Sequence, residues 1–203
     1  MQLKNLSKQE PLLVVSLGLV LFAAPFLYFF LKSSVQEEPV LGVGSAIVFS
    51  NQEQTSVGLP VRLKIPVIHV DSAVIPVGLT SDGAMDVPKG PAEVAWFDLG
   101  PRPGESGSAV IAGHYGWKNN TSAVFDNLHT LRKGDKIFVE DEKGLITTFV
   151  VREIRIYGKD EIVPDVFGSD DGKARLNLIT CTGDWNIEAK TRTDRLVVFT
   201  EKE

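Results

Sequence analysis

The sequence predicts an all-β domain, built as a barrel or sandwich of short strands, that follows a single N-terminal transmembrane helix. From residue 59 onward, short runs rich in Val, Ile and Phe alternate with turn residues, which is typical of many-stranded all-β folds. Upstream, the 21 residues 11–31 carry no charge and are long enough to cross a bilayer as a helix. We therefore divide the chain into a cytoplasmic N-terminus (1–10), a transmembrane anchor (11–31), an extracellular stalk (32–58) and a globular domain (59–203).

Charges on either side of the apolar run predict its orientation. Lys4 and Lys8 precede it, whereas Glu37 and Glu38 follow it, and positive residues concentrate on the cytoplasmic side of a membrane helix. We therefore expect a single-pass protein of the cell membrane, with its N-terminus in the cytoplasm and its domain outside. A cleaved secretory signal is the alternative, but the run exceeds a usual signal core and no convincing small-x-small site closes it. The net charge is −5; residues 1–32 carry +2, so residues 33–203 carry −7, and an acidic exterior domain argues against nucleic acid as a partner.

The expected strands follow one another along the domain. Val61, Leu63 and Ile65 alternate with polar residues in the first run, as in a half-buried strand. Two later runs flank an acidic turn that contains a glycine, and together they predict a hairpin. The full set comprises strands at 61–70, 72–79, 107–114, 135–141, 145–157, 174–181 and 195–202, and short helices at 92–97 and 122–128.

The chain contains one cysteine, Cys181, at the end of the apolar run "NLITC". A single cysteine cannot form an intrachain disulfide, so it serves either as a small buried hydrophobe or as a reactive thiol. Exported domains usually pair their cysteines, and an unpaired one in that compartment indicates a thiol kept for its chemistry. A nucleophilic thiol also needs a base or cation nearby and a donor for the charge that develops on the attacked carbonyl.

His114 and Arg195 are the candidates for these two roles. His114 ends an apolar run where the chain breaks into a polar turn, so its ring is expected at the rim of the fold. Arg195 begins the last strand, and antiparallel pairing of the last two strands would place it directly opposite Cys181. A guanidinium there favours a thiolate and can donate to an oxyanion. Arg192 is the competing arginine, but it falls inside the polar loop 182–194 expected between these strands.

Three features, taken together, resemble the sortases. "LITC" closes a strand, an arginine opens an apolar strand 14 residues later, and "VIAGH" lies about 67 residues before the cysteine. The family signature is a strand end of the form T-L-x-T-C, in which Asn177 here replaces the first threonine. The resemblance spans about Val61 to Lys202, together with the N-terminal anchor. The stretch "MDVPKGPAEVAWFDLGPRPGESGSAVIAGH" is most similar to the class F group.

This resemblance implies an eight-stranded β-barrel and makes 59–203 a sortase catalytic domain, a cysteine transpeptidase on the outer face of the membrane. Such enzymes cleave a C-terminal sorting signal of the Leu-Pro-x-Thr-Gly type between Thr and Gly. The resemblance assigns nucleophilic attack to Cys181, protonation of the leaving amine to His114, and oxyanion or substrate-backbone binding to Arg195. The resulting thioester passes to an amine on a cell-wall precursor or a pilin, and no cofactor or metal is expected.

Substrate-binding residues are expected in one loop and beside the thiol. The loop 157–172 is polar apart from four apolar residues, Ile162, Val163, Val166 and Phe167. Apolar residues in a loop often only pack it onto the barrel, but in this family the loop walls the sorting-signal groove, so they form the expected Leu-Pro pocket. Thr180 and Trp185, close to the thiol along the chain, complete the set. The acidic runs 140–142 and 170–171 adjoin glycines and are expected to be turns rather than calcium ligands.

Two other functions remain open from the sequence. A thiol peptidase that only hydrolyses its signal would carry the same residues. A non-catalytic, membrane-tethered binding domain with a sortase-like barrel would not need a cysteine, a histidine and an arginine together, so the complete set counts against it.

Overall fold

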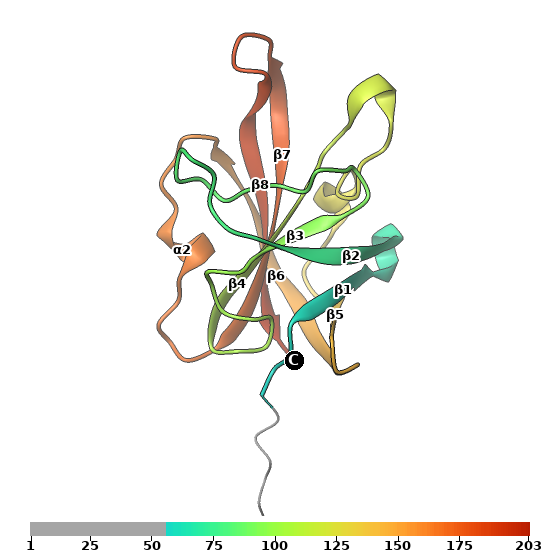
Figure 1. Ribbon diagram of the computed structural model, residues 1–203, viewed down its shortest axis with the longest axis vertical. Coiled ribbons are helices and arrows are strands. Elements are labelled where there is room, and N and C mark those ends of the chain that lie inside the picture. The colour runs from blue at the N-terminus through green and yellow to red at the C-terminus, as the bar shows by residue number, and fades with distance from the viewer. Residues whose placement is uncertain (1–55) are drawn as a thin grey trace, which may run out of the picture. The chain divides into compact units, whose positions relative to one another are not determined.

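The computed structural model describes residues 56–203, so the predicted cytoplasmic segment, the anchor and nearly all of the stalk lie outside the described residues. Between residues 56 and 203, no helix is long and apolar enough to cross a membrane. This part of the chain forms a closed barrel of eight strands (Figure 1). The expected eight-stranded β-barrel is therefore confirmed.

Short strands and turns make up the first part of the barrel, and three long strands make up the last part. The strands are β1 (Pro60–Ile65), β2 (Val70–Val77), β3 (Val94–Phe97), β4 (Gly107–Gly113), β5 (Lys136–Asp141), β6 (Ile146–Gly158), β7 (Ala174–Asn186) and β8 (Thr191–Lys202). Short helical turns occur at Pro66–Ile68, Lys118–Asn120, Leu128–Thr130 and, as α2, Pro164–Phe167.

The order of strands around the barrel is β1-β2-β3-β4-β7-β8-β6-β5, and β5 closes back onto β1. Most neighbours are antiparallel, but β2 with β3 and β4 with β7 are parallel pairs. Parallel neighbours cannot be joined by a tight hairpin, so the chain builds β5 and β6 before it returns beside β4 as β7. This crossover brings the end of β4 next to the middle of β7.

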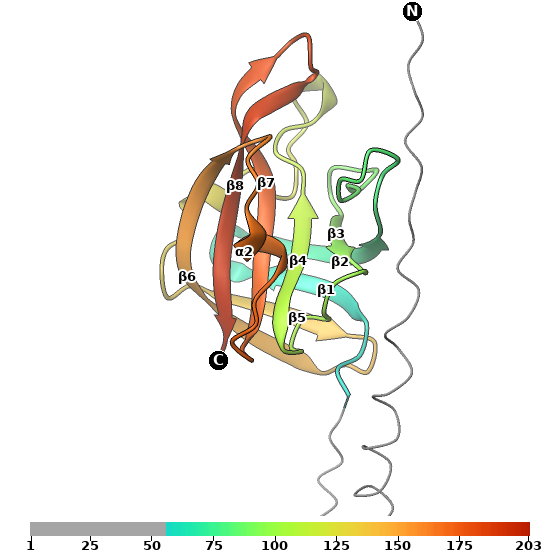
Figure 2. The ribbon, with the colours of Figure 1, turned by 90° about the vertical axis from the view of Figure 1, so that its left-hand side faces the viewer.

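Side chains alternate along each strand, so that one set fills the barrel and the other faces outward. The interior holds a continuous apolar core in which Leu63, Ile111, Phe149, Leu178 and Val198 are fully buried. A second, smaller cluster lies on the outer face of β4, β7 and β8, where α2 covers the sheet (Figure 2). Its buried members are Val110, Val166, Val197 and Phe199.

Neither expected helix forms. Residues Val94–Phe97 are strand β3, whose first three residues are buried between β2 and β4. An apolar run of this length is too short for its period to distinguish a strand from a helix, and burial between two strands decides the outcome. The segment 122–128 consists of irregular chain and turns that lead into the 3₁₀ turn Leu128–Thr130.

Asp141, at the end of β5, connects the start of the described chain, at Gly58, to the barrel by a hydrogen bond. Its buried carboxylate accepts hydrogen bonds from the backbone N–H groups of Gly58 (2.8 Å), Lys143 (2.9 Å) and Leu145 (2.9 Å). Burial alone would raise the pKa of Asp141, but these donors outweigh burial and hold the pKa below its usual value. A Cβ at Gly58 would lie 2.7 Å from the carboxylate oxygen, so this close approach requires glycine.

Replacing Asp141 with asparagine should destabilise the barrel at pH 7 by about 1–3 kcal/mol, because the backbone donors lose their charged acceptor. A carboxylate with a lowered pKa stabilises the folded state above the unfolded pKa of about 3.9, and this contribution is lost as pH falls through the folded pKa. The difference between wild type and Asp141→Asn should therefore be complete at pH 7 and shrink below about pH 4. Urea unfolding at a series of pH values measures it, and a difference independent of pH would contradict the assignment.

Candidate active site

The single thiol lies within a long hairpin formed by β7 and β8. The prediction that the strand ends at Cys181 is wrong, because β7 continues to Asn186 and β8 already begins at Thr191. The expected polar loop is therefore the far end of the hairpin, which projects beyond the barrel (Figure 1). Polar composition suggested a loop, but cross-strand pairing and threonines, which favour strands, keep these residues extended.

The pairing of β7 with β8 confirms the expected cross-strand neighbours. Cys181 lies directly opposite Arg195, and both line the same surface groove, where the thiol is unpaired and partly exposed. Arg195 uses three N–H groups within β8: Nη1 donates to the carbonyls of Arg192 (3.1 Å) and Asp194 (2.9 Å), and Nη2 donates to Thr191 Oγ1 (3.2 Å). A guanidinium has five N–H donors, so two remain for a substrate.

His114 directly follows β4, the other neighbour of β7. The parallel pairing of β4 with β7 extends as far as Ala112 opposite Ile179, and both of these residues line the groove. Continuing this register by two residues brings His114 level with Cys181 on the same face of the sheet. The strand order therefore brings the thiol between a histidine on one side and an arginine on the other.

A buried hydrogen bond joins β4 and β7 at this level. Thr180 Oγ1 donates to the carbonyl of Gly113 (2.8 Å), and these two residues immediately precede Cys181 and His114. Gly113 has no room for a side chain, because a Cβ would lie 2.5 Å from the ring of Phe125. The glycine of "VIAGH" is therefore explained by the close approach of this ring.

The ring of His114 is held from two directions. Its Nε2 lies 2.7 Å from the carbonyl oxygen of Pro88, and a carbonyl only accepts, so Nε2 carries a proton and donates it to this bond. The ring also packs against Trp117, with 4.6 Å between the ring centroids. Nδ1 is the nitrogen left to exchange a proton with a substrate.

Arg192 does not line the groove that Arg195 lines. Its Nη1 donates to the carbonyl of Gly183 (2.6 Å), and its guanidinium carbon lies 4.7 Å from the centroid of the Tyr115 ring. Arg192 therefore bridges the hairpin to the segment that follows His114. The geometry favours Arg195 over Arg192 for contact with a substrate.

An apolar groove of about 730 Å³ runs over the outer face of the barrel from Cys181 and Arg195 to α2. Its lining includes outward-facing residues of three strands, Ala112, Ile179 and Val197. Two segments, 79–87 and 157–167, supply most of the remaining lining. Some of this lining is exposed apolar surface, most of all Ile162 at 90%. Exposed apolar side chains gathered around a concave surface indicate a site for an apolar ligand.

The expected substrate-binding residues divide into two groups. Four of them line the groove: Ile162, Val163, Val166 and Phe167. Thr180 is buried and its hydroxyl is used between strands, so it positions the neighbouring residues instead of lining the groove. Trp185 lies in the outer part of the hairpin, largely exposed and outside the groove lining. The role of each residue in binding stays a prediction.

The segment between β2 and β3 lines the groove, although the sequence alone does not predict it as part of the site. Leu79, Met85 and Val87 from this turn-rich stretch line the groove, as does Tyr157 near the end of β6. The available signal was the presence of apolar residues within "GLTSDGAMDVPKGP", where turn residues alone would suffice for a connection. A turn-rich segment with apolar side chains is a candidate groove wall.

Comparison with known proteins identifies the family. The family model described as the sortase domain matches residues 63–203. This chain belongs to the sortase family. Its structure is similar to sortase C-1 from Actinomyces oris, with a TM-score of 0.56 and 28% identity over 70% of this chain and 72% of that chain. A lid mutant of sortase A from Corynebacterium diphtheriae has a TM-score of 0.57 and 21% identity, over 75% of this chain and 74% of that one. No curated protein sequence matches this chain.

This sortase is a cysteine transpeptidase. The chemistry of a cysteine acyl transfer needs a thiol nucleophile, a proton donor for the leaving amine and hydrogen-bond donors for the developing oxyanion. Cys181 is the only cysteine of the chain; Arg195 pairs with it across β8, and His114 follows the end of β4, at the position level with Cys181 when the β4–β7 register is continued.

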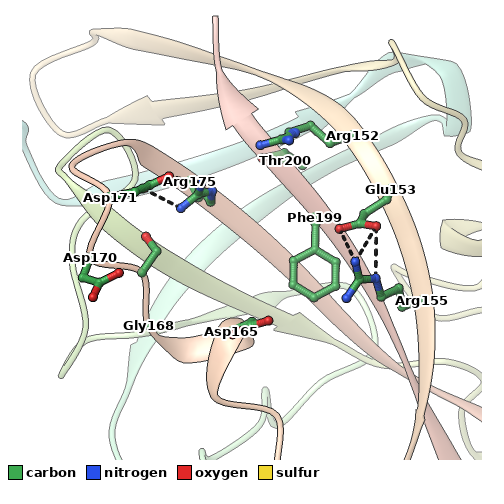
Figure 3. Close-up of a pocket in the computed structure, with 11 residues that line it drawn as sticks. Arg152, Glu153, Arg155, Asp165, Gly168, Asp170, Asp171, Arg175, Phe199 and Thr200 are labelled. Atoms are coloured by element: carbon green, nitrogen blue, oxygen red, sulfur yellow. Dashed lines mark hydrogen bonds and ion pairs between the residues drawn. The ribbon is translucent and has the colours of Figure 1, made fainter.

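A second, polar pocket of about 370 Å³ lies next to α2, lined by β6, β8 and the segment 165–171 (Figure 3). Its three arginines are each held in an ion pair, Arg152 with Glu201, Arg155 with Glu153 and Arg175 with Asp171. The sortase thus has an apolar groove that contains the thiol and a separate polar pocket, and α2 contributes lining to both.

Cys181→Ala should abolish peptide cleavage and leave the fold nearly unchanged. The side chain is partly exposed at the groove, so losing one sulfur atom opens little cavity and costs on the order of 1 kcal/mol. Activity on a sorting peptide and thermal unfolding of the same preparation measure both effects. An unfolded variant, or one that still cleaves, would return Cys181 to a packing role.

Arg195→Ala should lower kcat/KM by at least about a hundredfold, the order seen when an oxyanion donor is removed. Arg192→Ala is the matched control and should lower kcat/KM several-fold at most, because its guanidinium is committed to Gly183 and Tyr115. Steady-state kinetics of both variants on one peptide makes the comparison. The reverse order of effects would show that Arg192 is the arginine that contacts the substrate.

Proposed function

We propose that this sortase is anchored in the cell membrane, cleaves a Leu-Pro-x-Thr-Gly-like C-terminal sorting signal between Thr and Gly, and transfers the acyl group to an amine on the cell wall or on a pilin. The observation that carries the proposal is the thiol of Cys181 in an apolar groove, directly opposite Arg195. Exposed apolar lining suits the Leu-Pro part of such a signal, and a thiol in the same groove suits attack on a carbonyl further along the peptide.

In the proposed reaction, the thiolate of Cys181 attacks the Thr carbonyl carbon, and the two uncommitted N–H groups of Arg195 donate to the oxygen as it gains charge. The bond to the Gly nitrogen then breaks, and protonated His114 gives its proton to the leaving amine. The acceptor amine attacks the thioester, its proton passes to His114, and the thiolate of Cys181 leaves. Thiolate and imidazolium are thereby restored after each turnover.

The reaction is tested with a library of Leu-Pro-x-Thr-Gly peptides, the purified full-length protein and candidate amines, with products identified by mass. The proposal expects a new amide between the peptide up to Thr and the added amine. Hydrolysed peptide alone, at every amine concentration, would instead identify a thiol peptidase. Failure to cleave any peptide of the library would contradict the substrate class.

The membrane anchor and its orientation are also part of the proposal. They rest on the uncharged run 11–31 and on Lys4 and Lys8 before it. Protease added to intact cells should therefore remove the domain from the cell surface. Protection of the domain in intact cells, with digestion only after lysis, would contradict the orientation.

We further propose that this sortase belongs to the class F group. The support is the stretch 85–114, "MDVPKGPAEVAWFDLGPRPGESGSAVIAGH", which includes part of the groove lining and the candidate histidine. The solved structures compared above are those of a sortase C-1 and a sortase A. A sequence tree of the family that places this chain among class A or class C members would overturn the assignment.

A further inference from the structure

Asn177 is a fully buried polar residue on the outer face of β7. It lies four residues before Cys181 and therefore on the same face of the strand. Its exposed fraction is 0%, and its cross-strand neighbours are Val110 on β4 and Phe199 on β8, both buried beneath α2. A polar amide in this apolar cluster is costly unless its hydrogen bonds compensate.

The amide of Asn177 is directed at the backbone of α2. Its Nδ2 donates to the carbonyl of Val166 at 2.7 Å and lies 3.4 Å from the carbonyl of Asp165. Carbonyls accept and do not donate, so the NH₂ group must face α2. Its Oδ1 has no hydrogen-bond partner among the described residues and is buried. The side chain therefore meets its hydrogen-bonding needs only on the side that faces α2.

α2 is held on the sheet by the packing of Val166 in the outer apolar cluster, by an edge-to-face contact between Phe167 and Phe97 (5.6 Å between ring centroids) and by the Asn177 amide. α2 has four residues, and its one buried side chain is Val166, at 3% exposed. Phe167 of the same turn lines the apolar groove and is 47% exposed, whereas Asp165 lines the polar pocket (Figure 3). Any shift of α2 over the sheet would therefore change the lining of the groove. The Asn177 amide supplies the side-chain hydrogen bonds from β7 that hold this turn.

We infer that Asn177 is a positioning residue that sets the α2 wall of the groove and thereby determines which apolar residue of the sorting signal the enzyme accepts. The inference rests on the proposed function, because it concerns the same groove. It gives the one departure from the T-L-x-T-C signature a physical role: threonine has a shorter side chain with a single hydroxyl donor, whereas the asparagine NH₂ group has two N–H donors.

The test compares Asn177→Asp and Asn177→Thr with wild-type full-length protein. Aspartate keeps the shape but turns a carboxyl oxygen toward the two carbonyls, so α2 should move away. KM for the best library peptide should rise about tenfold in Asn177→Asp, with kcat within about threefold of wild type. The preference for that peptide over one with its Leu replaced by Ala should fall at least about fivefold. Asn177→Thr should change both quantities in the same direction by less.

Ser72→Ala is the matched control, because Ser72 is also buried and donates a hydrogen bond, to the carbonyl of Ala92 (2.8 Å), outside the groove lining. It should lower the melting temperature without changing KM or the preference for Leu. If the Asn177 variants behave in the same way, with only a lower melting temperature, the residue is merely structural and the inference is overturned. A fall in kcat with KM unchanged would also overturn it.

A second readout does not depend on activity. The N–H groups of Val166 and Gly168 bond to the carbonyls of Val163 and Pro164, and these bonds define the turn of α2. Their hydrogen exchange should be faster in both Asn177 variants and unchanged in Ser72→Ala; unchanged exchange in the Asn177 variants would overturn the inference. If wild type cleaves no sorting peptide, the proposed function fails, and the exchange measurement still decides whether Asn177 holds α2.

Discussion

The register between β7 and β8 is the constraint on which the site depends. Antiparallel pairing places Cys181 opposite Arg195, and the alternation of side chains places both on the outer face. A slip of one residue would carry the thiol into the barrel and expose its apolar neighbours. Leu178 and Val198, which pair across the same ladder and fill the core, oppose such a slip. The packing of the barrel therefore also aligns the site.

The parallel pairing of β4 with β7 supplies the other half of the site. Cys181 and His114, which are 67 residues apart along the chain, come to the same level of the sheet because a crossover through β5 and β6 returns the chain beside β4. The bond from Thr180 to the carbonyl of Gly113 fixes the level at which they meet, since it joins the residues just before them. Loss of this bond would leave the buried carbonyl of Gly113 without this hydrogen bond. A shift of β4 relative to β7 therefore has a free-energy cost.

The sequence predicted an all-β barrel or sandwich from the alternation in its strands, the eight-stranded barrel from its resemblance to the sortases, and the Cys181–Arg195 pair from antiparallel pairing of two neighbouring strands. It failed at β3, where burial between two strands decides the conformation of a short apolar run. It also failed at the hairpin, because polar residues beyond Cys181 pair across the strands in spite of their composition. The wall at 79–87 and the contact of Asn177 with α2 join distant segments, and no local pattern contains such contacts.

The groups around the thiol are positioned by contacts that do not involve a substrate. Arg195 is held by three acceptors of its own strand, and the His114 ring is held by Pro88 and Trp117. A donor positioned in advance loses little conformational freedom when charge develops near it, so its hydrogen bond favours the transition state.

Unlike the polar groups beside the thiol, apolar side chains of the groove wall are left exposed to water. The wall residue Ile162 is 90% exposed, and apolar surface left in water has a free-energy cost that a bound apolar peptide removes. The polar groups beside the thiol are held rigidly by hydrogen bonds, as chemistry at the thiol requires. The exposed apolar side chains of the groove wall are suited to binding a peptide. Changes to the segments 79–87 and 157–167 can therefore alter the apolar groove without moving Cys181, His114 or Arg195, because these are held by the strands and their own hydrogen bonds.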